Sequence, residues 1–238
     1  MTYTPITRGS SDWDVPLNAA LTDQDTRITN NTTSLGTQGT QITNLDTLTT
    51  THEGEINALQ SATSTLDWQP QDMNMKAWTQ DPAGCGSVGS ASTSGVMYLS
   101  RVLLRNAGTV SNLYYTVATA GSGLTAGQNW CGLYDSTGTK LAEGPDQSTV
   151  MTSLGTKTVA ITPQALAAGS YYIALLTNGT TPPQFMRGNG ASGSALNVGL
   201  TAATGRFLDF GTGQTTLPAS VTLSSAAFNA AARWGAMN

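Results

Sequence analysis

The one reaction that the acidic residues of this chain suggest is hydrolysis of a glycosidic bond. A general acid and a second carboxylate cleave such a bond when they flank it. Four acids in the C-terminal part could supply this pair: Asp135, Glu143, Asp146 and Asp209. Several of them lie beside turn-forming residues, where acids are commonly solvated, and the chain has no internal repeat. We therefore expect no enzymatic activity.

Other catalytic and metal-binding arrangements are also missing. His52 is the only histidine, and the C-terminal part has no Gly-x-Ser-x-Gly or Cys-x-x-Cys motif, which excludes most catalytic triads and zinc sites. Cys85 and Cys131 are too few for a disulfide framework, so we expect two separate thiols, with a bridge between them as the alternative. The glycine-rich residues 84–95 lack the lysine of a phosphate-binding loop and predict a flexible loop. No metal and no organic cofactor is expected.

Composition excludes further classes of partner. Charged residues make up 10% of the 238 residues, against about 25% in an average soluble protein. The net charge is −4 and neither half carries the basic stripe that a phosphate backbone would need, so we expect no nucleic acid partner. Nothing near Met1 resembles a signal peptide, and no run approaches the roughly 20 apolar residues of a membrane span. We expect a soluble protein, made in a cytosol, that inserts into no membrane.

Large apolar residues recur at seven-residue spacing between residues 21 and 66, which is the pattern of a coiled coil. As a positions they are Leu21, Ile28, Leu35, Ile42 and, further on, Ile56. The matching d positions begin polar and end apolar: Gln24, Asn31, Gln38, Leu45, His52, Leu59 and Leu66. Because such a seam is covered by other helices, residues 14–67 predict a stalk that needs partner chains.

The stalk sequence indicates obligate assembly of three chains. Asp14 can cap the helix and Pro16 suits its first turn. Gly36, Gly39 and Gly54, however, each weaken the helix by about 1 kcal/mol relative to alanine. The helix should therefore be unfolded as a monomer. The mixture of Ile and Leu at a positions argues against a two-stranded zipper and favours a parallel homotrimer.

The polar d positions predict layers of hydrogen-bonding side chains inside the trimer. The segment ITNNT at residues 28–32 resembles the Ile-x-x-Asn-Thr heptad of trimeric phage fibres and bacterial adhesins, in which a ring of Asn amides holds an anion. This resemblance implies a chloride or similar ion on the trimer axis at Asn31, and a layer that holds water is the alternative. Gln24, Gln38 and His52 are expected to form polar core layers, which places the only histidine in the core.

The segments on either side of the stalk have no heptads. Residues 1–13 are rich in turn formers and predict an extended arm. Tyr3 and Trp13 could anchor this arm to a larger assembly, and a disordered leader is the alternative. Residues 68–75 contain Pro70 and predict a linker.

From residue 76 the pattern changes to period two with frequent turn signals, which is typical of many short strands. Ten strands are expected near residues 76–79, 96–105, 111–120, 130–135, 140–143, 157–161, 170–177, 195–200, 206–209 and 220–224. A hairpin turn is predicted at residues 135–139, where Gly138 can adopt a positive φ. Residues 76–238 therefore predict an antiparallel, jelly-roll-like β-sandwich head, which gives a modular α+β fibre.

Exposed aromatic residues are the candidates for binding by this head, because they stack on sugar rings or fill protein pockets. Trp78 is one candidate contact with a receptor. The loop at residues 178–189 is the other, with Phe185, Met186 and Arg187 expected to project from a proline-stiffened tip. An ordinary surface loop is the alternative.

Three stretches of the head and one at the start of the stalk resemble minor tail proteins and fibres of tailed phages, especially those of actinobacteria. They are WDVPLNAALTDQDTRI (13–28), CGLYDSTGTKLAEG (131–144), ITPQALAAGSYYIALLTNG (161–179) and LPASVTLSSAAFNAAARWGAMN (217–238). Together they cover about a third of the chain. The motifs indicate a general class of protein and do not identify a particular receptor or binding site.

This resemblance implies a homotrimeric fibre of a phage virion that attaches to the bacterial surface. Residues 1–13 would dock on a tail or capsid protein, and the head would bind a host glycan or surface protein. A capsid-anchored head fibre or decoration spike, with a structural or accessory adhesive role, is the first alternative. A purely structural spike and a bacterial trimeric adhesin are the others.

Overall fold

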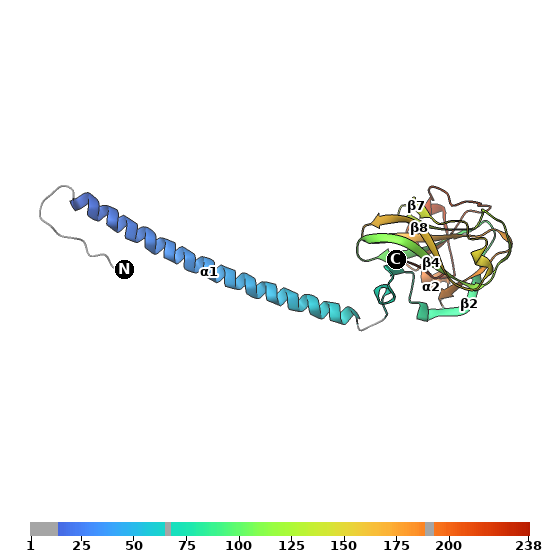
Figure 1. Cartoon of the computed structure of the whole chain (residues 1–238), viewed down its shortest axis with the longest axis horizontal. Coiled ribbons are helices and arrows are strands. Elements are labelled where there is room, and N and C mark those ends of the chain that lie inside the picture. The colour runs from blue at the N-terminus through green and yellow to red at the C-terminus, as the bar shows by residue number, and fades with distance from the viewer. Residues whose placement is uncertain (1–13, 65–67, 189–192) are drawn as a thin grey trace. The chain divides into compact units, whose positions relative to one another are not determined.

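The computed structural model describes residues 14–64, 68–188 and 193–238. The chain divides into two compact units between Asp67 and Trp68. The first contains α1 (Asp14–Ser64), a single helix of 51 residues, and the second is an antiparallel β domain (Figure 1). The expected long N-terminal helix and antiparallel β domain are confirmed. The predicted anchors Tyr3 and Trp13 lie outside the described residues.

Threonine hydroxyls along α1 bond to the helix's own backbone. Twelve threonines between Thr22 and Thr51 each donate to the carbonyl four residues earlier, as Thr29 does to Asp25 at 2.9 Å. Such bonds satisfy the hydroxyl locally but slightly destabilise a helix. They therefore do not compensate for the poor helix propensity of this threonine- and glycine-rich sequence.

The first sheet of the β domain is built on β4 (Gly108–Thr119). One edge of β4 pairs with β8 (Gly155–Leu166). The other edge pairs with two strands in succession along its length, first β14 (Gly235–Met237) and then, nearer the end of β4, β11 (Gln184–Gly188). Two further strands extend the sheet: β1 (Ala77–Trp78) pairs with β14, and β2 (Cys85–Ala91) pairs with β11. The last residues of the chain thus run beside the middle of β4.

The second sheet also has six strands, and all of its neighbours are antiparallel. Their spatial order is β13 (Ala227–Phe228), β12 (Phe207–Phe210), β3 (Met97–Leu104), β9 (Gly169–Leu176), β6 (Trp130–Asp135) and β7 (Lys140–Glu143). A separate ladder joins β5 (Ser122–Leu124) to β10 (Gly179–Thr181). The short helices are η1 (Pro70–Met73), η2 (Pro82–Gly84), η3 (Val150–Thr152), α2 (Gly193–Leu196), η4 (Ala202–Thr204) and η5 (Leu223–Ser225).

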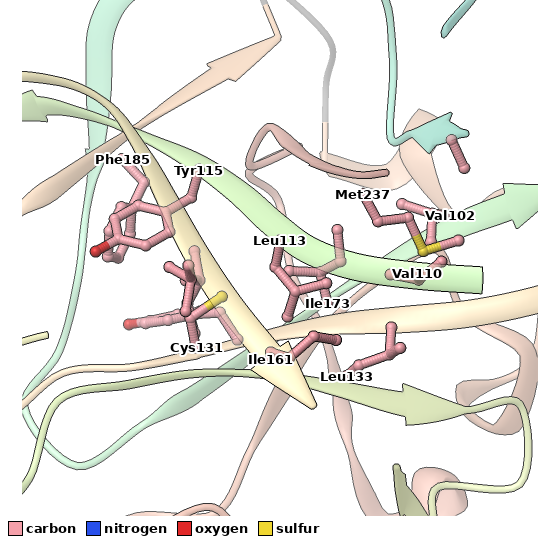
Figure 2. Packing of buried hydrophobic residues seen from close by; sticks show 14 of the residues in the cluster. Val102, Val110, Leu113, Tyr115, Cys131, Leu133, Ile161, Ile173, Phe185 and Met237 are labelled. Atoms are coloured by element: carbon pink, nitrogen blue, oxygen red, sulfur yellow. The ribbon is translucent and has the colours of Figure 1, made fainter. Parts of the chain in front are cut away.

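The two sheets share one hydrophobic core. Residues labelled in Figure 2 come from both: Leu113, Tyr115, Ile161, Phe185 and Met237 from the first sheet, and Val102, Cys131, Leu133 and Ile173 from the second. The alternation of buried residues along β4 and β8 explains this arrangement, since one face of each strand turns inward. β9 instead buries both faces between Tyr172 and Leu176, because a second cluster covers its outer side.

The predicted hairpin turn between β6 and β7 is confirmed. The Gly138 amide donates to the Asp135 carbonyl at 3.1 Å, and the Asp135 amide donates to the Thr139 carbonyl at 2.9 Å. Gly138 has a φ of 92°, a conformation that favours glycine.

Two segments predicted as loops are strands. Residues 84–95 contain β2, and residues 178–189 contain β11. These segments pair with each other, with Phe185 opposite Ser90, and β11 also pairs with the end of β4. Long-range pairing therefore overrides the weak strand propensity of the serine- and glycine-rich β2 segment.

Two predicted strands are absent from the described structure at their expected places. Residues 195–200 hold the end of α2 and a turn, and residues 220–224 hold the start of η5. Near the latter, Ser220 forms a single isolated bridge with Thr139. Apolar residues there pack into the second cluster from irregular backbone, as Val221 and Leu223 do.

Candidate functional site

The apolar heptad positions of α1 from Ile28 to Ile56 are exposed in the single chain. Ile28, Leu35 and Ile42 are 56%, 67% and 60% exposed, and Leu45 at a d position is 63% exposed. Isolated apolar residues on a surface are common, but a regular row of them marks a surface that another element covers.

The polar d positions lie on that row at the expected heptad spacing. Gln24, Asn31, Gln38 and His52 are all exposed in the single chain. The polar core layers, and the chloride at Asn31, stay predictions.

A pocket of about 410 Å³ lies in the β domain beside Trp78. Its volume is in the range of small-molecule sites, which run from about 300 to 1,000 Å³. Trp78 comes from β1, Arg101 and Leu103 come from β3, and Ser170 comes from β9. Along β3 the side chains alternate, so that Val102 and Leu104 enter the core while Arg101 and Leu103 face outward.

Three arginines line this pocket: Arg101, Arg105 and Arg206. Arg101 donates to the Thr204 carbonyl and to the Ser170 hydroxyl, both at 2.8 Å. Arg206 donates to the Thr79 carbonyl and lies over the Phe207 ring, with its guanidinium carbon 5.1 Å from the ring centroid. These contacts fix the two guanidinium groups at the wall of the pocket.

Buried Asn197 positions the backbone that carries Arg206. Its side-chain carbonyl accepts from the Arg206 amide at 2.7 Å and from the Phe207 amide at 3.2 Å. Its amide group donates to the Phe207 carbonyl at 3.2 Å. Burial lowers the pKa of Arg206, because a charged guanidinium is less stable away from water.

The two sets of predicted receptor contacts differ in the structure. Trp78 is half-buried and lines the pocket. The projection predicted for Phe185 is wrong: this side chain is fully buried, and its ring meets Tyr115 edge-on with centroids 5.5 Å apart (Figure 2). Met186 and Arg187 are half-buried within β11, and the Met186 carbonyl accepts from the Trp234 amide at 2.9 Å.

The four acids considered for catalysis have local partners. Asp135 accepts hydrogen bonds inside its turn, and Glu143 pairs with Lys140 at 2.8 Å. Asp146 accepts from the Ser148 hydroxyl and the Asn129 amide, and Asp209 accepts from Asn229. Within the described residues, no group of three or more His, Cys, Asp or Glu side chains could hold a metal ion.

Both cysteines are free thiols. Cys131 is buried in the core, and burial raises the pKa of its thiol. Cys85 is half-buried, and burial raises its thiol pKa although Gln80 donates a hydrogen bond to the sulfur at 3.2 Å.

The arginine cluster is the feature that sequence reasoning missed. Arg101 in β3 and Arg105, which directly follows β3, lie four residues apart and are a visible signal in the sequence, but Arg206 joins them only through the pairing of β3 with β12. In the described part of the chain, no helix is long and apolar enough to cross a membrane. No protein-family model, curated protein or solved structure matches the chain.

Proposed function

We propose that this protein is a homotrimeric fibre of a phage virion that attaches the particle to the bacterial host surface. The arm at residues 1–13 docks on a tail or capsid protein, α1 forms the trimeric stalk, and the jelly-roll-like β domain is the head that contacts a host glycan or surface protein. Its role is binding and not catalysis.

One observation carries the proposal: a single chain combines a 51-residue helix that has an exposed apolar heptad row with a β domain that has its own core. The helix lacks the propensity to persist alone, so its stability must come from association. A parallel trimer would bury the heptad row and would gather three heads at one end. Three heads on one stalk increase avidity for a surface that displays many copies of one receptor.

The resemblance of residues 13–28, 131–144, 161–179 and 217–238 to minor tail proteins and fibres of tailed phages supports the choice of a virion over other fibres. It also supports actinobacteria as hosts. The proposal includes two attachment points on the virion. A fibre attached to the tail would bind the receptor, and a fibre attached to the capsid would be an accessory adhesin. Immunogold labelling of intact virions distinguishes the two.

Binding of the fluorescently labelled full chain to a panel of actinobacterial cells tests the proposal. We expect saturable binding to some species and none to Gram-negative cells. The seam variant Leu35→Asp should lose trimers and bind cells more weakly, because it places a charge at an a position. The control Thr33→Asp places the same charge outside the seam and should retain both properties. Absence of cell binding across the panel would favour a purely structural spike.

A further inference from the structure

Two arginines occupy directly opposite positions on neighbouring strands. Phe207 of β12 pairs with Ser100 of β3, so Arg206 is opposite Arg101, and the Arg101 amide donates to the Arg206 carbonyl at 2.8 Å. Opposite residues of an antiparallel pair project from the same face of a sheet, and like charges there are destabilising. The fold therefore places two cations side by side at the pocket.

No carboxylate compensates for these charges within the described residues. The one ion pair found there joins Lys140 to Glu143, and no Asp or Glu lines the pocket. Arg105 adds a third guanidinium group to the lining. Each guanidinium has five N–H donors, and the two bonds of Arg101 to Thr204 and Ser170 leave donors free for a ligand. Such a group of donors fits carboxylate or phosphate oxygens.

The rest of the lining fits a larger molecule than a simple ion. Trp78 supplies an aromatic surface, and Leu103 and Leu200 supply apolar edges, to a volume of about 410 Å³. Aromatic side chains pack against the apolar faces of sugar rings, while polar groups in the same pocket fix the orientation. Ser170 provides a hydroxyl beside the arginines.

We propose that this pocket binds an anionic saccharide, one that carries carboxylate or phosphate groups, with Arg101, Arg105 and Arg206 holding the charged group and Trp78 contacting the sugar. The inference rests on the proposed attachment function, and it names the class of receptor and the place on the head where it binds. The charged group relieves the repulsion between Arg101 and Arg206, so the ligand should also stabilise the fold.

Calorimetric titration of the full chain tests the inference. The probes are a hyaluronan hexasaccharide for carboxylates, a phosphorylated maltohexaose for phosphates, inorganic phosphate for the ion alone, and unmodified maltohexaose as the neutral saccharide. We expect one anionic saccharide to bind, inorganic phosphate to bind more weakly and maltohexaose not to bind. Which anionic saccharide binds decides between the two charged groups. Added salt should weaken the binding.

Arg105→Gln is the decisive variant, because no described hydrogen bond or ion pair depends on this exposed side chain. It should weaken binding about tenfold or more, at an unchanged melting temperature. Trp78→Ala should weaken it as well. The control Lys157→Gln removes one positive charge outside the pocket and should bind as the wild type does.

The inference is overturned if no anionic saccharide binds, if maltohexaose binds equally well, or if Lys157→Gln weakens binding as much as Arg105→Gln. Cell binding separates it from the attachment function. Wild-type protein that binds cells, together with an Arg105→Gln variant that binds them equally, would contradict the pocket and leave attachment intact. Protein that binds an anionic probe but no cells would contradict attachment and leave the pocket intact.

Discussion

Arg233 stacks on Tyr98 inside the β domain, with its guanidinium carbon 3.5 Å from the centroid of the ring. Both side chains are buried. Burial lowers the pKa of Arg233, while the neighbouring Tyr98 and Asp209 raise it. Arg233 also donates to the Ala91 carbonyl at 2.9 Å, so it ties the C-terminal segment to the end of β2.

Arg233→Ala should reduce the free energy of unfolding by about 2–4 kcal/mol, because it removes a buried cation–π contact and leaves the Ala91 carbonyl without this donor. Arg233→Lys should recover only part of this loss, since an ammonium group does not stack as a planar guanidinium does. Urea unfolding of the full chain measures both effects. Arg105→Ala is the control, because this arginine is exposed, and an Arg233→Ala variant as stable as Arg105→Ala would contradict this role.

Gly138 lies in the hairpin turn between β6 and β7, and Gly127, in a turn between β5 and β6, is its matched control. Both have positive φ, 92° and 72°. A Cβ at Gly138 would lie 2.1 Å from the Val221 carbonyl oxygen, whereas a Cβ at Gly127 would meet nothing within 4 Å. Gly127→Ala should cost about 1 kcal/mol of stability from backbone strain alone, and Gly138→Ala should cost clearly more, about 3 kcal/mol. Equal losses in thermal unfolding would contradict the close approach at Gly138.

Asp135 should make the stability of the β domain depend on pH. Partial burial opposes its ionisation, but hydrogen bonds from Thr137, Thr139 and Gly138 outweigh burial and lower the pKa of Asp135 below its usual value. The ionised carboxylate therefore contributes stability above the unfolded-state pKa, and this contribution is lost as the pH falls through the lower folded-state pKa. Asp135→Asn should be less stable than the wild type at about pH 7, and the difference should shrink by about pH 2.5.

Urea unfolding at both pH values checks this expectation. Glu143→Gln is the control, because it removes a carboxylate whose single partner is Lys140 in a partly exposed pair, and such pairs contribute little. A difference between the wild type and Asp135→Asn that stays constant with pH would contradict the role of the ionised carboxylate.

Helices and strands were predicted correctly where the sequence pattern that specifies them lies within one continuous segment. A turn with the sequence signature of a hairpin joins residues 130–135 to residues 140–143, and both strands have the expected bounds. The α1 helix was predicted from heptads that extend over most of its length. In these cases periodicity, turn chemistry and strand propensity all favour the same structure.

Features that depend on distant pairing could not be predicted. β2 has few residues that favour a strand, and it forms because β11 pairs with it. The same pairing places the Phe185 side chain in the core, although the sequence alone predicted that it would project from an exposed loop tip. The pocket needs Arg206 opposite Arg101, which only the register of β12 on β3 establishes. Residue type alone made Trp78 a candidate receptor contact, whereas none of the three arginines that line the same pocket was a candidate from the sequence.

Asn31→Leu should raise the melting temperature of the stalk. In the proposed trimer Asn31 is a polar d layer, and replacing such a layer with well-packed apolar residues removes a desolvation cost. Asn30→Leu makes the same change one residue away, outside the seam, and should give no such rise. Circular dichroism of the full chain at the helix band measures the transition. A melting temperature that does not rise with Asn31→Leu would contradict the assignment of the seam.

Multi-angle light scattering of the purified full chain tests the central claim most directly. The heptad row of α1 is proposed to be covered by two further copies of the same chain, so the mass should be three times 24.6 kDa and should not change on dilution. The seam variant Leu35→Asp should lose this mass and the helical signal together, because the helix depends on assembly. A monomer or a dimer in solution would contradict the trimeric fibre.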